Sequence, residues 1–243
     1  MNDREREQYA AFLSGRRDEL LERIARAASR SGRDASEVTL LAVSKTVDVE
    51  EVLLAHSVGY RVFGENRPQE LKRKVAQLES FPEMGDARFD MIGNLQTNKV
   101  NQVLGNATLI HSVSSEHLLE TIARRAGMRG QVARCLLEVN VSGEASKSGF
   151  GPSEVLSACE FAQACKGMRL EGMMTMAPAG DMDAARRTFS GLRELRDGLV
   201  ERTGLPLEIL SCGMSGDFEI AIEEGSTLVR LGRIVFDPTY ASA

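Results

Sequence analysis

A lysine and an arginine stand at the ends of two apolar runs, near opposite ends of the chain. Lys45 follows the run at residues 38–44, and Arg230 lies in the run at residues 227–231. A lysine amine that has lost its proton attacks an aldehyde to form a Schiff base, and burial among apolar neighbours favours the unprotonated amine. A guanidinium stays protonated and only donates hydrogen bonds. The pair predicts a ligand that carries an aldehyde and an acceptor nitrogen.

Loops near the end of the chain add a predicted phosphate site. Ser215 precedes a helical run at residues 217–224, and Gly232 follows the last apolar run. Backbone N–H groups of such loops and helix starts hold a dianion, although a serine there is also an ordinary helix cap. Together with Lys45 and Arg230, these loops predict a site for pyridoxal 5'-phosphate (PLP).

Two further side chains bear on the ring of such a cofactor. Arg230 opposite the pyridine nitrogen would keep that nitrogen unprotonated, which makes the ring a weak electron sink and disfavours transamination. Its structural alternative is an ion pair. Asn66 follows a second apolar run and either donates to the edge of the ring or caps a turn.

Apolar or β-branched runs alternate with helical stretches from residue 38 onward, which predicts an α/β fold with a parallel sheet. We expect a single (β/α)8 TIM barrel at about residues 38–236 with an extra N-terminal helix at about residues 8–30, all in one domain of residues 1–243. An open, doubly wound sheet is the alternative. Polar clusters follow the runs, where barrels carry their chemistry. The expected strands are residues 38–44, 61–63, 89–92, 108–112, 132–139, 169–174, 207–211 and 227–231.

The composition and charge of the chain limit the kinds of partner that we expect it to bind. The net charge of -5 comes from 30 basic and 35 acidic residues that are mixed along the chain, so no nucleic-acid partner is expected. No apolar stretch is long enough to span a bilayer, and the first residues lack the apolar core of a signal peptide, so we expect a cytoplasmic protein. Four cysteines and three histidines show no metal-ligand spacing, and no metal is expected.

Several motifs closely resemble the pyridoxal phosphate homeostasis protein family, over about residues 20–236. The resemblance implies a barrel similar to the amino-terminal domain of alanine racemase. The motifs are Ala42-Val43-Ser44-Lys45, Phe63-Gly64-Glu65-Asn66, His111-Ser112 and the segments at residues 92–99, 138–140, 147–149, 172–174, 213–217 and 225–232.

Roles for individual residues follow from this resemblance. It implies that PLP is held at Lys45 and that its phosphate lies against Ser215, Thr227 and Gly232. It also places Arg230 at the pyridine nitrogen and Asn66 near the ring. The family is tied to PLP (vitamin B6) homeostasis without an established catalytic turnover.

One departure from the family's pattern stands in the predicted third strand. The family often has Trp-His ahead of Ile-Gly, where this chain reads Phe89-Asp90-Met91. This departure leaves the binding of the cofactor intact. A contact that a partner makes with that strand edge would be changed by it.

Three activities fit a lysine on such a barrel. We expect a holder of PLP, with apo PLP-dependent enzymes as recipients and a monomeric or weakly dimeric state. A PLP-dependent amino-acid racemase of the alanine racemase type is the alternative, but it needs a second base opposite the lysine. Alanine racemases take that base, a tyrosine, from a second domain, for which this chain leaves no room after the last strand. A Schiff-base aldolase is the third reading, and it predicts no colour in the resting protein.

Overall fold

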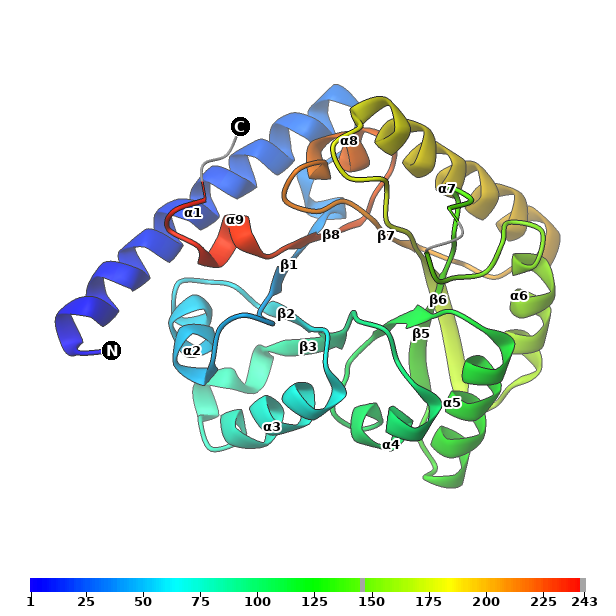
Figure 1. Cartoon of the computed structure of the whole chain (residues 1–243), viewed down its shortest axis with the longest axis horizontal. Coiled ribbons are helices and arrows are strands. Elements are labelled where there is room, and N and C mark those ends of the chain that lie inside the picture. Colours follow the sequence, from blue (N-terminus) through cyan, green and yellow to red (C-terminus); the bar gives the residue numbers. More distant parts are fainter. Residues whose placement is uncertain (145–146, 241–243) are drawn as a thin grey trace.

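A computed structural model describes residues 1–144 and 147–240, so residues 145–146 and 241–243 of the predicted domain lie outside the described residues. Eight parallel strands pair in the order β1 to β8 and close when β8 pairs with β1 (Figure 1). The predicted (β/α)8 barrel is therefore confirmed. The strands are β1 Thr39–Val43, β2 Val62–Glu65, β3 Arg88–Met91, β4 Ile110–Val113, β5 Ala133–Glu138, β6 Met168–Met174, β7 Ile209–Ser211 and β8 Leu228–Leu231.

Helices surround the barrel (Figure 1). Short 3-10 turns at Ala35–Glu37, Pro82–Asp86 and Thr97–Lys99 join some of the elements. The helices are α1 Asp3–Arg30, α2 Val49–Ser57, α3 Pro68–Leu78, α4 Val100–Val103, α5 Glu116–Met128, α6 Val155–Ala164, α7 Met182–Thr203, α8 Phe218–Glu223 and α9 Arg233–Phe236.

Helix α1 begins at Asp3, five residues before the predicted start at about residue 8. Asn2 accepts a hydrogen bond from the Glu5 N–H, and Glu5 accepts one from the Asn2 N–H, which forms a capping box. This cap extends the helix beyond the apolar face on which the prediction rested. The buried side chains of α1 all lie further along, at Leu13, Leu20, Ile24, Ala27 and Ala28.

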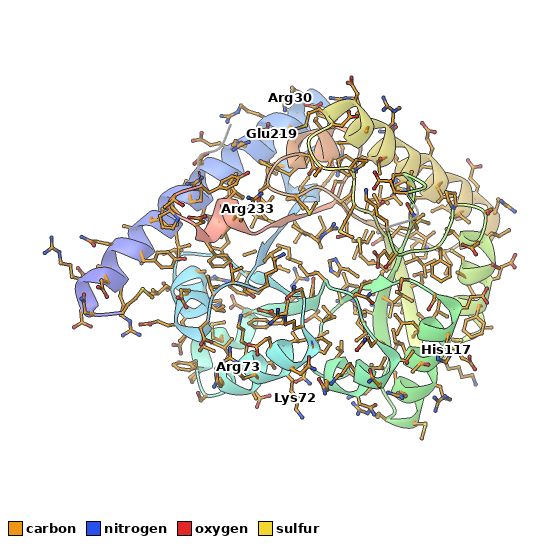
Figure 2. All side chains as sticks on the ribbon, viewed as in Figure 1. Arg30, Lys72, Arg73, His117, Glu219 and Arg233 are labelled. Carbon is orange, nitrogen blue, oxygen red and sulfur yellow. The ribbon has the colours of Figure 1, made fainter. Side chains whose placement is uncertain are left out.

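Outside the barrel, α1 contacts α2, α8 and α9. Two ion pairs join it to α8: Arg23 Nε lies 3.0 Å from Glu219 Oε1, and Arg30 Nε lies 2.6 Å from Glu223 Oε1. Figure 2 shows Arg30 and Glu219 at this contact. Helix α1 therefore bridges the elements that follow the first strand and those that flank the last one.

Side chains alternate between the barrel interior and the helices, as the two-residue period of a strand requires. Leu41, Val43, Val62 and Leu228 form a cluster inside the barrel, whereas the flanking positions such as Phe63 join the larger core beneath the helices. Register then places residues of neighbouring strands at matching heights. This fixes which side chains can meet at each end of the barrel.

Within the described part of the chain, we find no helix with the length and apolar character that a membrane crossing requires.

Candidate cofactor site

Four of the predicted site residues gather at the carboxyl end of the barrel. On β1, Val43 is in register with Gly64 of β2, so Lys45 and Asn66 both follow the ends of paired strands. On the other side of β1, a Cβ added to Gly232 would lie 3.4 Å from the Val43 Cβ. Ser215 follows β7 at the same end of the barrel. There its Oγ accepts a hydrogen bond from the Ile234 N–H, at 3.5 Å.

Lys45 lies in the turn that follows β1, and its side chain is exposed. The alternation of Leu41 and Val43 places it on the inward side of the strand, so it stands above the mouth. The expected burial beside apolar residues is absent, because the turn extends beyond the end of the sheet. A ligand can therefore reach the amine directly.

A buried ion pair beneath this turn holds its backbone. Lys74 of α3 donates from Nζ to the carbonyl oxygens of Ser44 and Val47, at 2.8 and 2.6 Å, and to Glu65 Oε1 at 2.6 Å. The side chains of Lys74 and Glu65 are only 2% and 1% exposed. Ser44 Oγ donates to the same carboxylate oxygen at 2.9 Å. The carbonyls on both sides of Lys45 are thus tied to α3.

Arg230 points into the barrel from β8 and is 5% exposed. Its Nη1 donates to the Ser211 carbonyl oxygen and to Ser211 Oγ, at 2.6 and 2.7 Å, and its Nη2 donates to the Thr175 carbonyl oxygen at 3.1 Å. These three bonds use three of the five N–H donors of a guanidinium. No carboxylate of the described residues forms an ion pair with it, so two donors remain for a ligand. The structural alternative of an ion pair does not hold.

Burial has the largest effect on the pKa of Arg230. Removal from water lowers the pKa of Arg230, and the nearby carboxylates of Asp217 and Glu138 raise it again. Burial also raises the pKa of Glu138 and of Asp217, against the effect of the Arg230 charge. The guanidinium is therefore fixed by neutral hydrogen-bond acceptors, with carboxyl groups at a greater distance.

Two loops at the mouth present free backbone donors. The N–H groups of Ser215 and Gly216, after β7, and of Gly232 and Arg233, after β8, find no acceptor among the described residues. Ser215 Oγ connects the two loops through Ile234. Four N–H groups and a hydroxyl on two loops in contact are a suitable cradle for an anion. The residues present thus fit the phosphate of PLP.

The structure does not bring Thr227 to this cradle. Thr227 precedes β8, so it lies at the amino end of the barrel, whereas Gly232 follows the same strand at the other end. Its Oγ1 accepts from the Leu210 N–H at 2.9 Å and donates to the Glu208 carbonyl oxygen at 3.3 Å. The prediction that Thr227 shares the phosphate with Ser215 is corrected by this placement, and we leave Thr227 out of the site.

Sequence reasoning missed a line of polar side chains that crosses the barrel interior below Arg230. His111 of β4 is fully buried; its Nδ1 lies 2.9 Å from Ser211 Oγ, and its Nε2 lies 3.1 Å from Asp90 Oδ2. Burial lowers the pKa of His111, which favours the neutral ring. The positions of Asp90 and His111 in apolar runs were the only signal in the sequence.

Comparison with known proteins identifies the family of this barrel. The family model described as alanine racemase, N-terminal domain, matches residues 16–238. The pyridoxal phosphate homeostasis protein of Aquifex aeolicus is 40% identical over 218 residues, which is 89% of this chain and 94% of the relative. An unknown protein from Bifidobacterium adolescentis is 37% identical, with a TM-score of 0.87 and 97% of each chain covered.

A solved structure with its cofactor is also similar. PipY of Synechococcus elongatus, solved with PLP bound, is 31% identical, with a TM-score of 0.76 and coverage of 88% of this chain and 99% of PipY. Fold and site together define a barrel of the alanine racemase N-terminal domain class. Within that class, the chain belongs to the pyridoxal phosphate homeostasis protein family.

Proposed function

We propose that the protein binds PLP at the carboxyl end of the barrel and serves the homeostasis of this cofactor. The observation that carries the proposal is the cradle of four free N–H donors at the mouth that also presents Lys45 and the donors of Arg230. The bound PLP of PipY and the names of the relatives support it further.

Each residue of the proposed site has a distinct role. Lys45 binds the aldehyde carbon of PLP as a Schiff base, and Arg230 donates to the pyridine nitrogen. Ser215 and the N–H groups of Gly232 and its neighbours hold the phosphate, and Asn66 donates to the edge of the ring. When bound, PLP supplies an electrophilic carbon and an electron-accepting ring. Arg230 weakens that ring as an electron acceptor because a guanidinium keeps its protons, which leaves the pyridine nitrogen unprotonated.

Titration of the PLP-free protein tests the proposal directly. Addition of PLP should produce a visible absorbance band that saturates at one equivalent per chain, and borohydride should fix the cofactor to Lys45. Mass spectrometry of the digested protein locates the modified lysine. Saturation without any modification at Lys45 would refute the proposed attachment. An aldolase would instead be trapped with a sugar and show no band with PLP.

Removal of the hydroxyl at Ser215 tests the phosphate cradle. We expect Ser215→Ala to raise the Kd for PLP by about tenfold to a hundredfold, because a hydrogen bond to a charged group is worth about 1.5–3 kcal/mol. Equilibrium dialysis measures the Kd, and Ser157→Ala, at an exposed site on α6, is the matched control. Equal affinities of Ser215→Ala and this control would place the phosphate elsewhere.

Exchange of the α-hydrogen distinguishes a holder from a racemase. We expect negligible incorporation of deuterium into L- and D-alanine by the PLP-loaded protein in heavy water, because racemisation needs a second base opposite Lys45 and each of the three tyrosines is engaged in other contacts. Tyr9 donates to the Phe236 carbonyl oxygen and Tyr60 to the Leu13 carbonyl oxygen. Tyr240, which lines a pocket with Ser215 and Gly216, lies against the guanidinium of Arg233. Proton NMR follows the loss of the α-hydrogen signal. Rapid exchange that disappears in Lys45→Ala would establish the racemase instead.

We further propose that residues 1–243 form a single PLP-binding domain that acts in the cytoplasm as a monomer or weak dimer. The four cysteines are free thiols, as is usual for proteins of a reducing compartment. The open mouth at Lys45 supports release of PLP to apo PLP-dependent enzymes. Loaded protein mixed with such an apoenzyme should restore activity faster than the same concentration of free PLP.

A further inference from the structure

A second cavity lies at the amino end of the barrel, opposite the proposed PLP site. Its volume is about 360 Å³, within the range of about 300–1,000 Å³ that is usual for small-molecule sites. The residues around it stand at the beginnings of the strands, such as Thr39 of β1, Arg88 of β3, Arg134 of β5 and Leu228 of β8. Nothing in the proposed function uses this end of the barrel.

Two exposed residues of opposite charge, Arg88 and Glu208, line the cavity without charged protein partners among the described residues. Arg88 forms no ion pair or side-chain hydrogen bond with the described residues, unlike Arg134, which Glu171 binds through both carboxylate oxygens at 2.7 and 2.6 Å. Glu208 also has no cationic partner among the described residues. The cavity therefore offers one free guanidinium and one free carboxylate.

A buried carboxylate lies at the inner end of the same cavity. The Asp90 side chain is 4% exposed, and its Oδ2 lies 3.1 Å from His111 Nε2. Its Oδ1 accepts no hydrogen bond from the described residues. The hydroxyls of Thr39 and Thr108 on the cavity wall are also unused by described side chains.

From these contacts we infer that the cavity binds a small zwitterion of the α-amino acid type, with its carboxylate on Arg88 and its ammonium group toward Asp90 and Glu208. A guanidinium forms paired hydrogen bonds with a carboxylate, and a buried carboxylate oxygen without a donor favours a cation that brings N–H groups. A simple anion would leave Asp90 and Glu208 without a counterion. A simple cation would lie close to the charge of Arg88.

The hydrogen bonds of the barrel interior connect this cavity to Arg230. Arg230 can only donate to Ser211 Oγ, so the Ser211 hydroxyl hydrogen is free to point at His111 Nδ1. A neutral His111 then carries its hydrogen on Nε2 and donates it to Asp90. This order of donors satisfies each group in the line.

A positively charged group bound at Asp90 attracts the negative charge of the carboxylate. Asp90 then becomes a weaker acceptor for the hydrogen bond from His111 Nε2. The weaker bond alters the contact of His111 with Ser211 Oγ, and with it the hydrogen bond that Arg230 donates to Ser211 Oγ. In the proposed site, Arg230 meets the pyridine nitrogen of PLP. This second step rests on the proposed function, whereas binding in the cavity does not. By linkage, PLP must change the affinity for the zwitterion by the same factor by which the zwitterion changes the affinity for PLP.

N,N-dimethylglycine is the probe for binding, because its tertiary amine cannot form a Schiff base with PLP. Calorimetry on the PLP-free protein should give saturable binding of this probe, and at least tenfold weaker binding of acetate and of trimethylamine. Arg88→Met should abolish the binding. Arg169→Met is the matched control, since Arg169 lies at the same end of the barrel but pairs with Glu171 and does not line the cavity. It should bind like the parent.

Absence of saturable binding, or equal binding by Arg88→Met and the control, would overturn the cavity as a zwitterion site. The coupling has its own readout in the PLP-loaded protein. Saturating N,N-dimethylglycine should shift the visible band of bound PLP in the parent and leave it unchanged in His111→Gln. A parent spectrum that does not move while calorimetry shows the probe bound would overturn the coupling alone. Failure of PLP to bind would concern the proposed function and leave the calorimetric result intact.

Discussion

Lys45→Ala should lose the visible Schiff-base band that the parent forms with PLP, so that its spectrum with PLP matches that of free PLP, and borohydride should leave no cofactor on the chain. The amine of Lys45 is the group at the mouth that forms a covalent bond with the aldehyde carbon in the proposed site. Absorbance spectroscopy and intact-protein mass spectrometry measure the two effects. We expect the phosphate cradle to retain weak, non-covalent binding, since its N–H donors are untouched by the substitution.

Lys72→Ala is the matched control for this experiment. Lys72 lies on α3, is exposed and points away from the barrel (Figure 2). It should keep the band and the borohydride product of the parent. A normal band in Lys45→Ala would show that another amine carries PLP, and a lost band in Lys72→Ala would show that the effect is not local to the mouth.

Lys74→Met should cost about 3–5 kcal/mol of the free energy of unfolding. Removing one partner of a buried ion pair leaves the other charge uncompensated, and the Glu65 side chain is almost fully buried. Its Oε2 already has no hydrogen-bond partner, so Oε1 alone accepts the bonds that stabilise the carboxylate. Urea denaturation of the PLP-free protein measures the change.

A second variant separates the charge from the packing of Lys74. The double variant Glu65→Gln with Lys74→Met should recover part of the loss, because no buried charge then remains without a partner. Lys72→Met, at an exposed position of the same helix, should change the unfolding free energy by less than about 0.5 kcal/mol. Equal stability of Lys74→Met and Lys72→Met would mean that the pair contributes nothing to the fold.

The barrel could be predicted from the sequence because each strand buries both of its faces. Runs such as residues 132–139, in which only Arg134 and Glu138 are charged, are therefore apolar on both faces, and their alternation with helical segments indicates a parallel sheet. The ends of the helices and strands were predicted less accurately. The N-terminal helix began earlier than predicted because Asn2 and Glu5 cap it, a local signal that carries no apolar periodicity.

The position of a site residue could be predicted only where the sequence showed whether that residue precedes or follows its strand. Lys45, Asn66, Ser215 and Gly232 all follow a strand, and the structure brings them to one end. Thr227 begins a strand, and the likeness of its motif to the family concealed that difference. The contacts of His111 with Asp90 and Ser211 could not be predicted, because they cross the barrel between β3, β4 and β7. Only the closed register places those side chains together.

Helix α1 has a consequence for how the chain completes its fold. It precedes the first strand, and it contacts α8 and α9, which flank the last one. The pairing of β1 with β8 joins residues nearly the whole chain length apart, and such contacts are slow to form. Helix α1 packs against α2 as well as α8, so it spans the seam at which β8 meets β1. The segment before the first strand therefore reinforces the closure of the barrel, at the pairing whose partners lie farthest apart in the sequence.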